Sequence, residues 1–116
     1  LETGRRKEAL RWFYRAVAEA PSLREGYVEC AWYFSQEENW PGVLLMSQSA
    51  LAITQRDKTY INEDFAWGSV PWDLSALAFW HLGQKEKACF YGVRALEKEP
   101  ENQRLQQNLA FYQGEK

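Results

Sequence analysis

The sequence has few of the residues that bind metals or form disulfides. It contains two cysteines, Cys30 and Cys89, and a single histidine, His81. Each cysteine lies in an apolar helical pattern without a paired cysteine or a clustered histidine, so we expect two buried free thiols. His81 likewise has no cysteine or carboxylate at ligand spacing on its own predicted helix. The sequence therefore predicts neither a metal site nor a bound cofactor.

Long apolar runs and an excess of one charge are missing as well. No stretch of about 18 apolar residues is present to span a bilayer, and the first residues lack the apolar core of a signal peptide. The formal net charge of −2 gives no general attraction to nucleic acid or to an anionic membrane. We therefore expect a cytoplasmic protein that binds neither nucleic acid nor membranes.

Aromatic and aliphatic side chains are abundant. Of the 116 residues, 46% are hydrophobic and 16% are aromatic, with six each of Trp, Tyr and Phe. Such a chain is long enough to bury one modest core and too apolar to remain a disordered linker. Its rings are therefore either packed in that core or used to bind a partner.

A pattern of small and aromatic residues occurs twice and, in part, a third time. On the first helix of each copy it comprises Tyr27, Cys30, Ala31 and Phe34, and then Trp72, Ser75, Ala76 and Phe79. On the second helix it comprises Val43, Ser47, Ala50 and Leu51, and then Ala88, Gly92, Ala95 and Leu96. A lone second helix precedes both, with Ala9, Phe13 and Ala16. These spacings resemble the tetratricopeptide repeat, a helix-turn-helix unit of 34 residues.

The distance between equivalent residues locates an insertion. Ala16 and Ala50 are 34 positions apart, as expected for directly stacked repeats, whereas Ala50 and Ala95 are 45 apart. The surplus lies in a stretch without a sustained helical period. We therefore divide the chain into a half repeat (1–21), a repeat (22–55), an insert (56–68), a second repeat (69–100) and a capping helix (101–116).

The pattern predicts an all-α fold, a tetratricopeptide-like stack of antiparallel helical hairpins (an α-solenoid) with a C-terminal capping helix. Helices are expected over 3–19, 23–37, 40–54, 69–82, 85–98 and 102–113, with Ala31, Ala76 and Ala110 where two helices cross closely. Because the chain begins on a second helix, we expect it to be a fragment of a larger protein. Its uncovered Trp12 and Phe13 should then favour self-association through the truncated N-terminal helix.

Several segments resemble a narrower family. They are Ala50-Leu51-Ala52-Ile53-Thr54, Tyr60-Ile61-Asn62-Glu63, Ala66-Trp67-Gly68 and Pro71-Trp72-Asp73-Leu74. From about Ala9 to Tyr112 the chain is similar to the repeat region of bacterial and phage family-two glycosyltransferases. The resemblance implies a nucleotide-sugar-dependent transferase as the parent, with a catalytic α/β domain ahead of the repeats. The Asp-x-Asp element of such a domain has no match here, which implies that this chain is not itself an enzyme.

The inner, concave surface of such a stack is lined by the first helices of its repeats. The expected lining residues are Glu25, Val28, Trp32, Ser35, Gln36, Asp73, Leu77, Trp80, His81 and Arg104, with Val70, Gln107 and Phe111 continuing the row. Tryptophan faces flanked by polar groups suit a peptide or a sugar-bearing ligand. The alternative is that Trp32 and Trp80 pack against a neighbouring layer or domain.

The insert is a second candidate site, through Tyr60, Asn62, Phe65 and Trp67. Left exposed, these rings would form a costly apolar patch, so they either fold back over a hairpin or form a contact surface. Of the two alternatives, folding back is the one we favour.

Two functions fit this sequence. The first is a non-catalytic scaffold or interaction domain, the C-terminal repeat region of a glycosyltransferase, which positions the catalytic domain, its acceptor or its subunits. The second is a stand-alone adaptor that binds a peptide in its concave groove. Both make the partner a protein or a peptide, and in the first case this partner can be the chain's own glycosyltransferase domain.

Overall fold

The chain is helical wherever the structure describes regular elements. The computed structural model describes residues 11, 15, 24–54 and 64–114. Its helices are α2 (Arg24–Gln36), α3 (Trp40–Ala52), α4 (Asp64–Trp67), α5 (Val70–His81), α6 (Lys85–Lys98) and α7 (Gln103–Tyr112). The predicted all-α class is thus confirmed for this part of the chain. None of these helices is long and apolar enough to cross a membrane.

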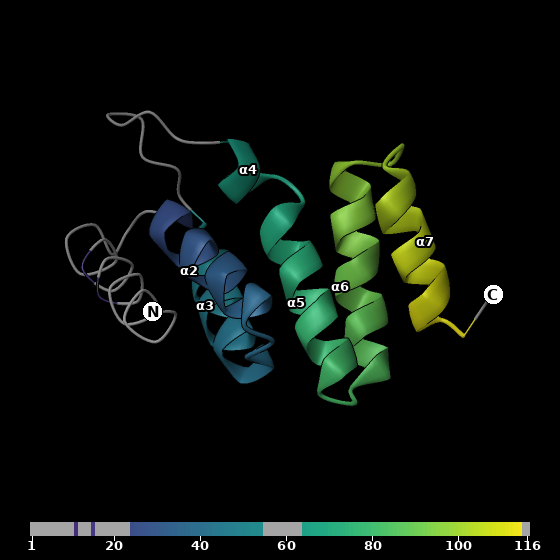
Figure 1. Cartoon of the computed structure of the whole chain (residues 1–116). Helices are drawn as coiled ribbons and strands as arrows, with labels where there is room; N and C mark the ends of the chain where they lie inside the picture. The colour runs from purple at the N-terminus through teal and green to yellow at the C-terminus, as the bar shows by residue number, and fades with distance from the viewer. Residues whose placement is uncertain (1–10, 12–14, 16–23, 55–63, 115–116) are drawn as a thin grey trace.

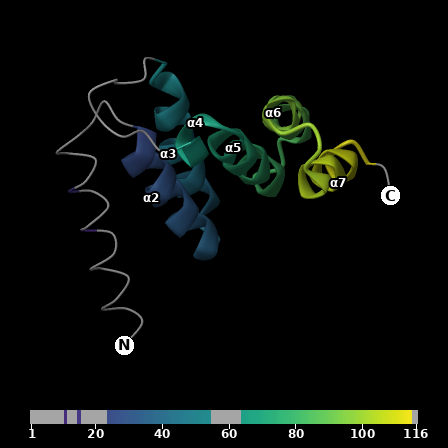
Figure 2. The ribbon, with the colours of Figure 1, turned by 90° about the horizontal axis from the view of Figure 1, so that it is seen from above.

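The described helices pack against one another in chain order. α2 packs against α3, α3 against α5, α5 against α6 and α6 against α7, while α4 contacts α2 and α5. Figure 1 shows this row, and the view from above in Figure 2 shows α6 set to one side of the line that joins α5 and α7. The turns at 37–39 and 82–84 are short, so α2–α3 and α5–α6 are antiparallel hairpins.

Capping side chains and a glycine set several helix ends. The Asn39 side chain accepts a hydrogen bond from the Gly42 amide at 3.1 Å, at the start of α3. Asn102 caps α7 in the same way, by accepting from the Leu105 amide at 3.2 Å. After α5, Gly83 has φ of +82°, a conformation that only glycine adopts without a steric cost. These local signals explain why the helix ends can be read from the sequence.

The predicted helix boundaries are confirmed to within two residues for α2, α3, α5, α6 and α7. Pro41 and Pro71 stand in the first turns of α3 and α5, where a missing amide hydrogen costs nothing. The helix predicted over 3–19 lies outside the described residues, apart from Arg11 and Arg15, which are helical.

Small residues occupy the places where helices approach each other. The buried ones include Ala31, Ala50, Ala76, Ala88 and Ala95. A larger side chain at such a crossing would force the helices apart. The predicted role of Ala31 and Ala76 as crossing residues agrees with their complete burial, whereas Ala110 is only half-buried.

A chain of polar side chains joins α3, α5 and α6. The Ser75 hydroxyl donates to the Ser47 hydroxyl at 2.8 Å and accepts from the Gln48 side-chain amide at 3.1 Å. The Gln48 side chain in turn accepts from the Tyr91 hydroxyl at 3.2 Å. Both serines are fully buried, so each hydroxyl would be costly to leave unpaired. This network therefore connects the second helix of the first hairpin to both helices of the second.

A buried arginine holds α4 against the first hairpin. The Arg24 side chain donates to the Ile53 carbonyl at 2.7 Å and to the Ala66 carbonyl at 3.4 Å. Its guanidinium carbon also lies 4.0 Å from the centre of the Trp67 ring, a cation–π contact. The sequence did not predict α4, because a four-residue helix is too short to show a helical period. Trp67 of the insert packs on the core, whereas Tyr60 and the side chain of Phe65 lie outside the described residues, so the folding back of the insert as a whole stays a prediction.

We expect Ser75→Ala to lower the free energy of unfolding by about 1–3 kcal/mol, because Ser47 and Gln48 would both lose a partner inside the protein. Ser49→Ala is the matched control, since the Ser49 hydroxyl donates to the Leu45 carbonyl one turn earlier at the surface. It should change stability by less than about 0.5 kcal/mol. Urea denaturation followed by circular dichroism measures both, and equally small effects would contradict the role of the network.

Candidate binding surface

The candidate surface is the side of α2, α5 and α7 that carries most of the predicted lining residues, and we call it the α2–α5–α7 face. α5 contacts α2 directly, and it contacts α7 through an ion pair and through rings. The face comprises Trp32 and Gln36 from α2, Leu77 and Trp80 from α5, and Arg104, Gln107 and Phe111 from α7. Within each helix these residues are three or four positions apart, so they lie on one side of it.

Trp80 is the ring that joins α5 to α7. Its centre lies 5.0 Å from that of Phe111, in an edge-to-face arrangement, and 5.6 Å from that of Tyr112. Tyr112 is buried and Phe111 is exposed, so the cluster is packed on its inner side and open on its outer side. On α2, Trp32 is 55% exposed. A ring held by neighbouring rings, as Trp80 and Phe111 are, can stack on a partner at little cost in conformational entropy.

An ion pair lies beside these rings. Arg104 Nη1 is 3.0 Å from Asp73 Oδ2, and Asn108 also hydrogen-bonds the Asp73 carboxylate. Burial raises the pKa of Asp73, and the charge and the hydrogen bond of Arg104 partly offset that rise. Asp73 is buried, whereas the Arg104 side chain is 59% exposed. The pair thus fixes α7 against α5 and leaves part of the guanidinium open to solvent.

Two of the predicted lining residues, Val28 and Asp73, are buried, so the prediction that their side chains line the surface is wrong. Val28 is completely buried among the core residues of the first hairpin and lines no surface. The reason is that α2 packs against α5 and α4 as well as against α3, so a wider strip of α2 is covered than one hairpin would cover. Asp73 is also buried, and it reaches the surface only through Arg104.

Other predicted lining residues take part in local contacts. The Ser35 hydroxyl donates to the Trp32 carbonyl of its own helix. The His81 ring stacks on Trp40, with ring centres 4.1 Å apart and planes within 2° of parallel. His81 therefore belongs to the contact between the start of α3 and the end of α5. Glu25 is half-buried in the first turn of α2. A binding role for these three residues stays a prediction.

Most of the candidate side chains of the insert lie outside the described residues. Tyr60 and Asn62 lie outside the described residues, as does the side chain of Phe65. Trp67 is half-buried beneath the Arg24 guanidinium, so this ring is used within the molecule. A contact surface formed by the other three residues stays a prediction.

Sequence reasoning missed a second surface, a groove beside α3. Its lining includes Leu44, Leu45 and Leu82, together with small and polar residues of α3. A signal was present, because α3 has no charged side chain in 13 residues. A helix with one side facing solvent normally carries charges there, so this absence points to an interaction surface.

The described residues include both cysteines and the single histidine of the chain. They form no group of three His, Cys, Asp or Glu side chains placed to bind a metal ion. Both cysteines are free, as predicted, although Cys89 is only half-buried. Burial raises the pKa of Cys30 to about 11, which is opposite to what a nucleophilic thiol requires.

Comparison with protein-family models gives no match to this chain, and comparison with curated proteins gives none either. The resemblance to glycosyltransferase repeat regions therefore stays a prediction that rests on the segments quoted above. The surfaces described here depend on the geometry alone.

We expect Arg104→Gln to destabilise the protein in a pH-dependent way. Burial raises the folded-state pKa of Asp73 above its unfolded value, so stability falls as the pH rises between the two values. Loss of Arg104 raises the folded-state pKa of Asp73 further, because Arg104 stabilises the charged carboxylate. The variant should cost about 1–2 kcal/mol near pH 7 and less below a pH of about 4, because Arg104 stabilises only the charged form of Asp73.

Urea denaturation at the two pH values measures this difference. Arg94→Gln is the control, because Arg94 forms an exposed pair with Glu97 on its own helix and should cost less than about 0.5 kcal/mol at either pH. If the free energy of unfolding lost in Arg104→Gln is the same at both pH values, the proposal that this loss comes from the pair with Asp73 is contradicted.

Proposed function

We propose that this chain is a non-catalytic helical-repeat scaffold that binds a protein segment on its α2–α5–α7 face. The observation that carries the proposal is the combination of open and fixed rings there. Trp32 and Phe111 are exposed, and Trp80 is held between α5 and α7. Rigid rings of this kind are common anchors of protein interfaces, in which a few residues contribute most of the binding energy.

The polar groups of the face favour an extended segment as the ligand. Gln36 and Gln107 are exposed, and their amides can both donate to and accept from the backbone of an extended peptide. The charge of Arg104 is partly balanced by Asp73, so the face carries no strong net charge. A segment that brings aromatic or aliphatic side chains fits better than one that is highly charged.

The tetratricopeptide assignment belongs to the same proposal. Two helical hairpins followed by one further helix are the order that two repeats and a capping helix would have. In that architecture the first helices of the repeats line the concave side, and here these helices are α2, α5 and α7. The ligand would then lie across all three helices.

The identity of the bound segment separates two versions of this proposal. If the resemblance to family-two glycosyltransferases holds, the segment belongs to the parent's own catalytic domain, its acceptor or a second subunit. The alternative is a stand-alone adaptor that binds a peptide from another protein. The reading frame upstream of residue 1 distinguishes them, because an α/β domain with an Asp-x-Asp element would favour the first version.

We expect Trp32→Ala to weaken peptide binding at least about tenfold, which corresponds to about 1.4 kcal/mol, because the variant removes an exposed ring of the face. The probe is a peptide selected from a random library against residues 1–116, with its affinity measured by calorimetry. Phe90→Ala is the matched control, because Phe90 on α6 is 51% exposed, close to the 55% of Trp32, yet lies off this face. Equal losses in the two variants, or a selection that yields no peptide, would contradict the proposal.

A further inference from the structure

Two contacts hold α5 and α7 side by side, and the two helices run in the same direction (Figure 1). At one end, Arg104 Nη1 donates to Asp73 Oδ2 at 3.0 Å. Seven positions later in both helices, at 80 and 111, the rings of Trp80 and Phe111 meet with their centres 5.0 Å apart. Seven helical residues rise about 10 Å. We call the strip between these two contacts, about 10 Å long, the α5–α7 strip.

Both ends of the α5–α7 strip are open to solvent. The Phe111 residue is 58% exposed, and the Arg104 side chain is 59% exposed. Gln107 is exposed as well and stands between them on the same side of α7. Leu77 and Trp80 of α5 are half-buried and pack on the core, so their positions are fixed. A ligand on this strip therefore meets fixed apolar groups, with a guanidinium at one end and rings at the other.

The polar groups of the α5–α7 strip offer more hydrogen-bond donors than acceptors. Arginine has only N–H donors, and Arg104 uses Nη1 for Asp73. The Asp73 carboxylate is buried and is already hydrogen-bonded by Arg104 and Asn108. Gln107 contributes an amide, which has both donors and an acceptor. The strip therefore favours a ligand that brings carbonyl oxygens and few N–H groups.

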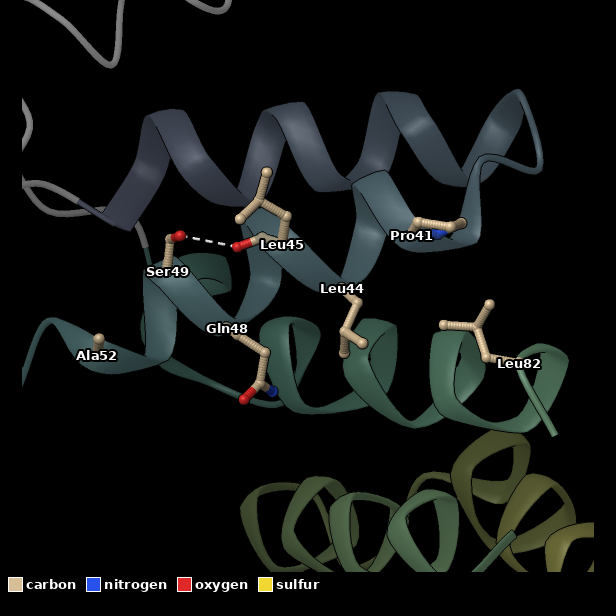
Figure 3. A pocket seen from close by; sticks show the side chains of 7 residues that line it. All are labelled: Pro41, Leu44, Leu45, Gln48, Ser49, Ala52 and Leu82. Carbon is tan, nitrogen blue, oxygen red and sulfur yellow. Dashed lines mark hydrogen bonds between the residues drawn. The ribbon is translucent and has the colours of Figure 1, made fainter. Parts of the chain in front are cut away.

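The groove beside α3 has a different chemistry. Its Ser49 hydroxyl donates to the Leu45 carbonyl of the same helix at 2.7 Å (Figure 3). The Gln48 side chain donates to Ser75 and accepts from Tyr91. These polar groups are thus already hydrogen-bonded within the molecule. A segment recognised through its backbone carbonyls finds more free donors on the α5–α7 strip than in this groove.

We propose that the segment bound on the α2–α5–α7 face contains proline and lies along the α5–α7 strip in the polyproline II conformation, an inference that rests on the proposed function. Proline has no backbone N–H, and proline-rich segments bind surfaces lined by aromatic rings. Their conformation is largely formed before binding, which lowers the entropic cost.

The length of the strip matches one turn of such a segment. A polyproline II helix has about three residues per turn and rises about 3.1 Å per residue, so one turn spans about 9 Å. A proline that packs on the rings of Trp80 and Phe111 thus places a backbone carbonyl, three residues away, near the Arg104 guanidinium. We therefore expect prolines spaced three residues apart in the bound segment.

The test begins with the peptide selected from a random library against residues 1–116. We expect it to contain prolines three residues apart, and we compare it with a version in which each proline is replaced by alanine. Both peptides have blocked termini, so that no terminal carboxylate can bind Arg104. The alanine version should bind at least about tenfold more weakly in calorimetry, because it restores the N–H groups and removes the rings.

Two variants of the protein locate the proline. Phe111→Ala removes a ring on which the proline packs, so this variant should bind the two peptides with affinities within about threefold of each other. Trp32→Ala is the matched control, because Trp32 is 55% exposed but lies on α2, outside the strip. It should weaken both peptides and keep the tenfold preference for proline. Circular dichroism shows that each variant is folded, and the ratio of the two affinities is insensitive to a general loss of stability.

Several outcomes would overturn the inference while the proposed function stands. One is a selected peptide without proline, or one whose alanine version binds equally well, when Trp32→Ala still weakens binding. Another is a preference for proline that Phe111→Ala leaves unchanged. A third is a peptide rich in Asp and Glu whose affinity is lost on replacement by Asn and Gln, because Arg104 would then bind carboxylates. A selection that yields no peptide would contradict the proposed function and this inference together.

Discussion

The close approach of neighbouring helices is the constraint on which the rest of this structure depends. At the contact between α3 and α5, two buried hydroxyl groups, those of Ser47 and Ser75, meet at 2.8 Å. At the contact between α6 and α7, a Cβ atom added to Gly92 would lie 3.3 Å from side-chain atoms of Leu109 and Tyr112. Small residues at these positions let the helices pack directly, which buries apolar area while keeping the hairpins in one fixed order.

This packing determines where the large side chains go. Rings cannot occupy the crossings, so Phe34 and Phe79 fill the space beside them and other rings are displaced outward. The displaced rings give the α2–α5–α7 face its open Trp32 and Phe111, next to exposed amides. On α3 the outward side is aliphatic, and its polar atoms are already hydrogen-bonded. One packing scheme thus leaves two surfaces of different chemistry, one with open rings and amides and one that is aliphatic.

Periodic and local features of this fold could be predicted from the sequence, and contacts between distant segments could not. The spacing of Ala31 and Ala76 and the prolines and glycine at helix ends located α2, α3, α5, α6 and α7, but not the four-residue α4. The side chain of Arg24, by contrast, bonds a carbonyl 29 residues away, and Tyr91 bonds a glutamine 43 residues away. Such pairings leave no periodic signal, which is why the burial of Val28 and the role of Arg24 were missed. On the α2–α5–α7 face, the aromatic residues and their spacing could be predicted from the sequence. The contact between Trp80 and Phe111 could not, because it depends on how α7 packs against α5.

The requirement for small residues at the crossings is tested most directly by enlarging one of them. Ala76 is fully buried in the second hairpin, and Ala52 is exposed at the end of α3. The decisive measurement is the free energy of unfolding of Ala76→Leu beside that of Ala52→Leu, at protein concentrations low enough to exclude association. If close approach controls the fold, Ala76→Leu loses about 1–3 kcal/mol while Ala52→Leu stays within about 0.5 kcal/mol of the parent. An Ala76→Leu variant as stable as the parent would contradict the account.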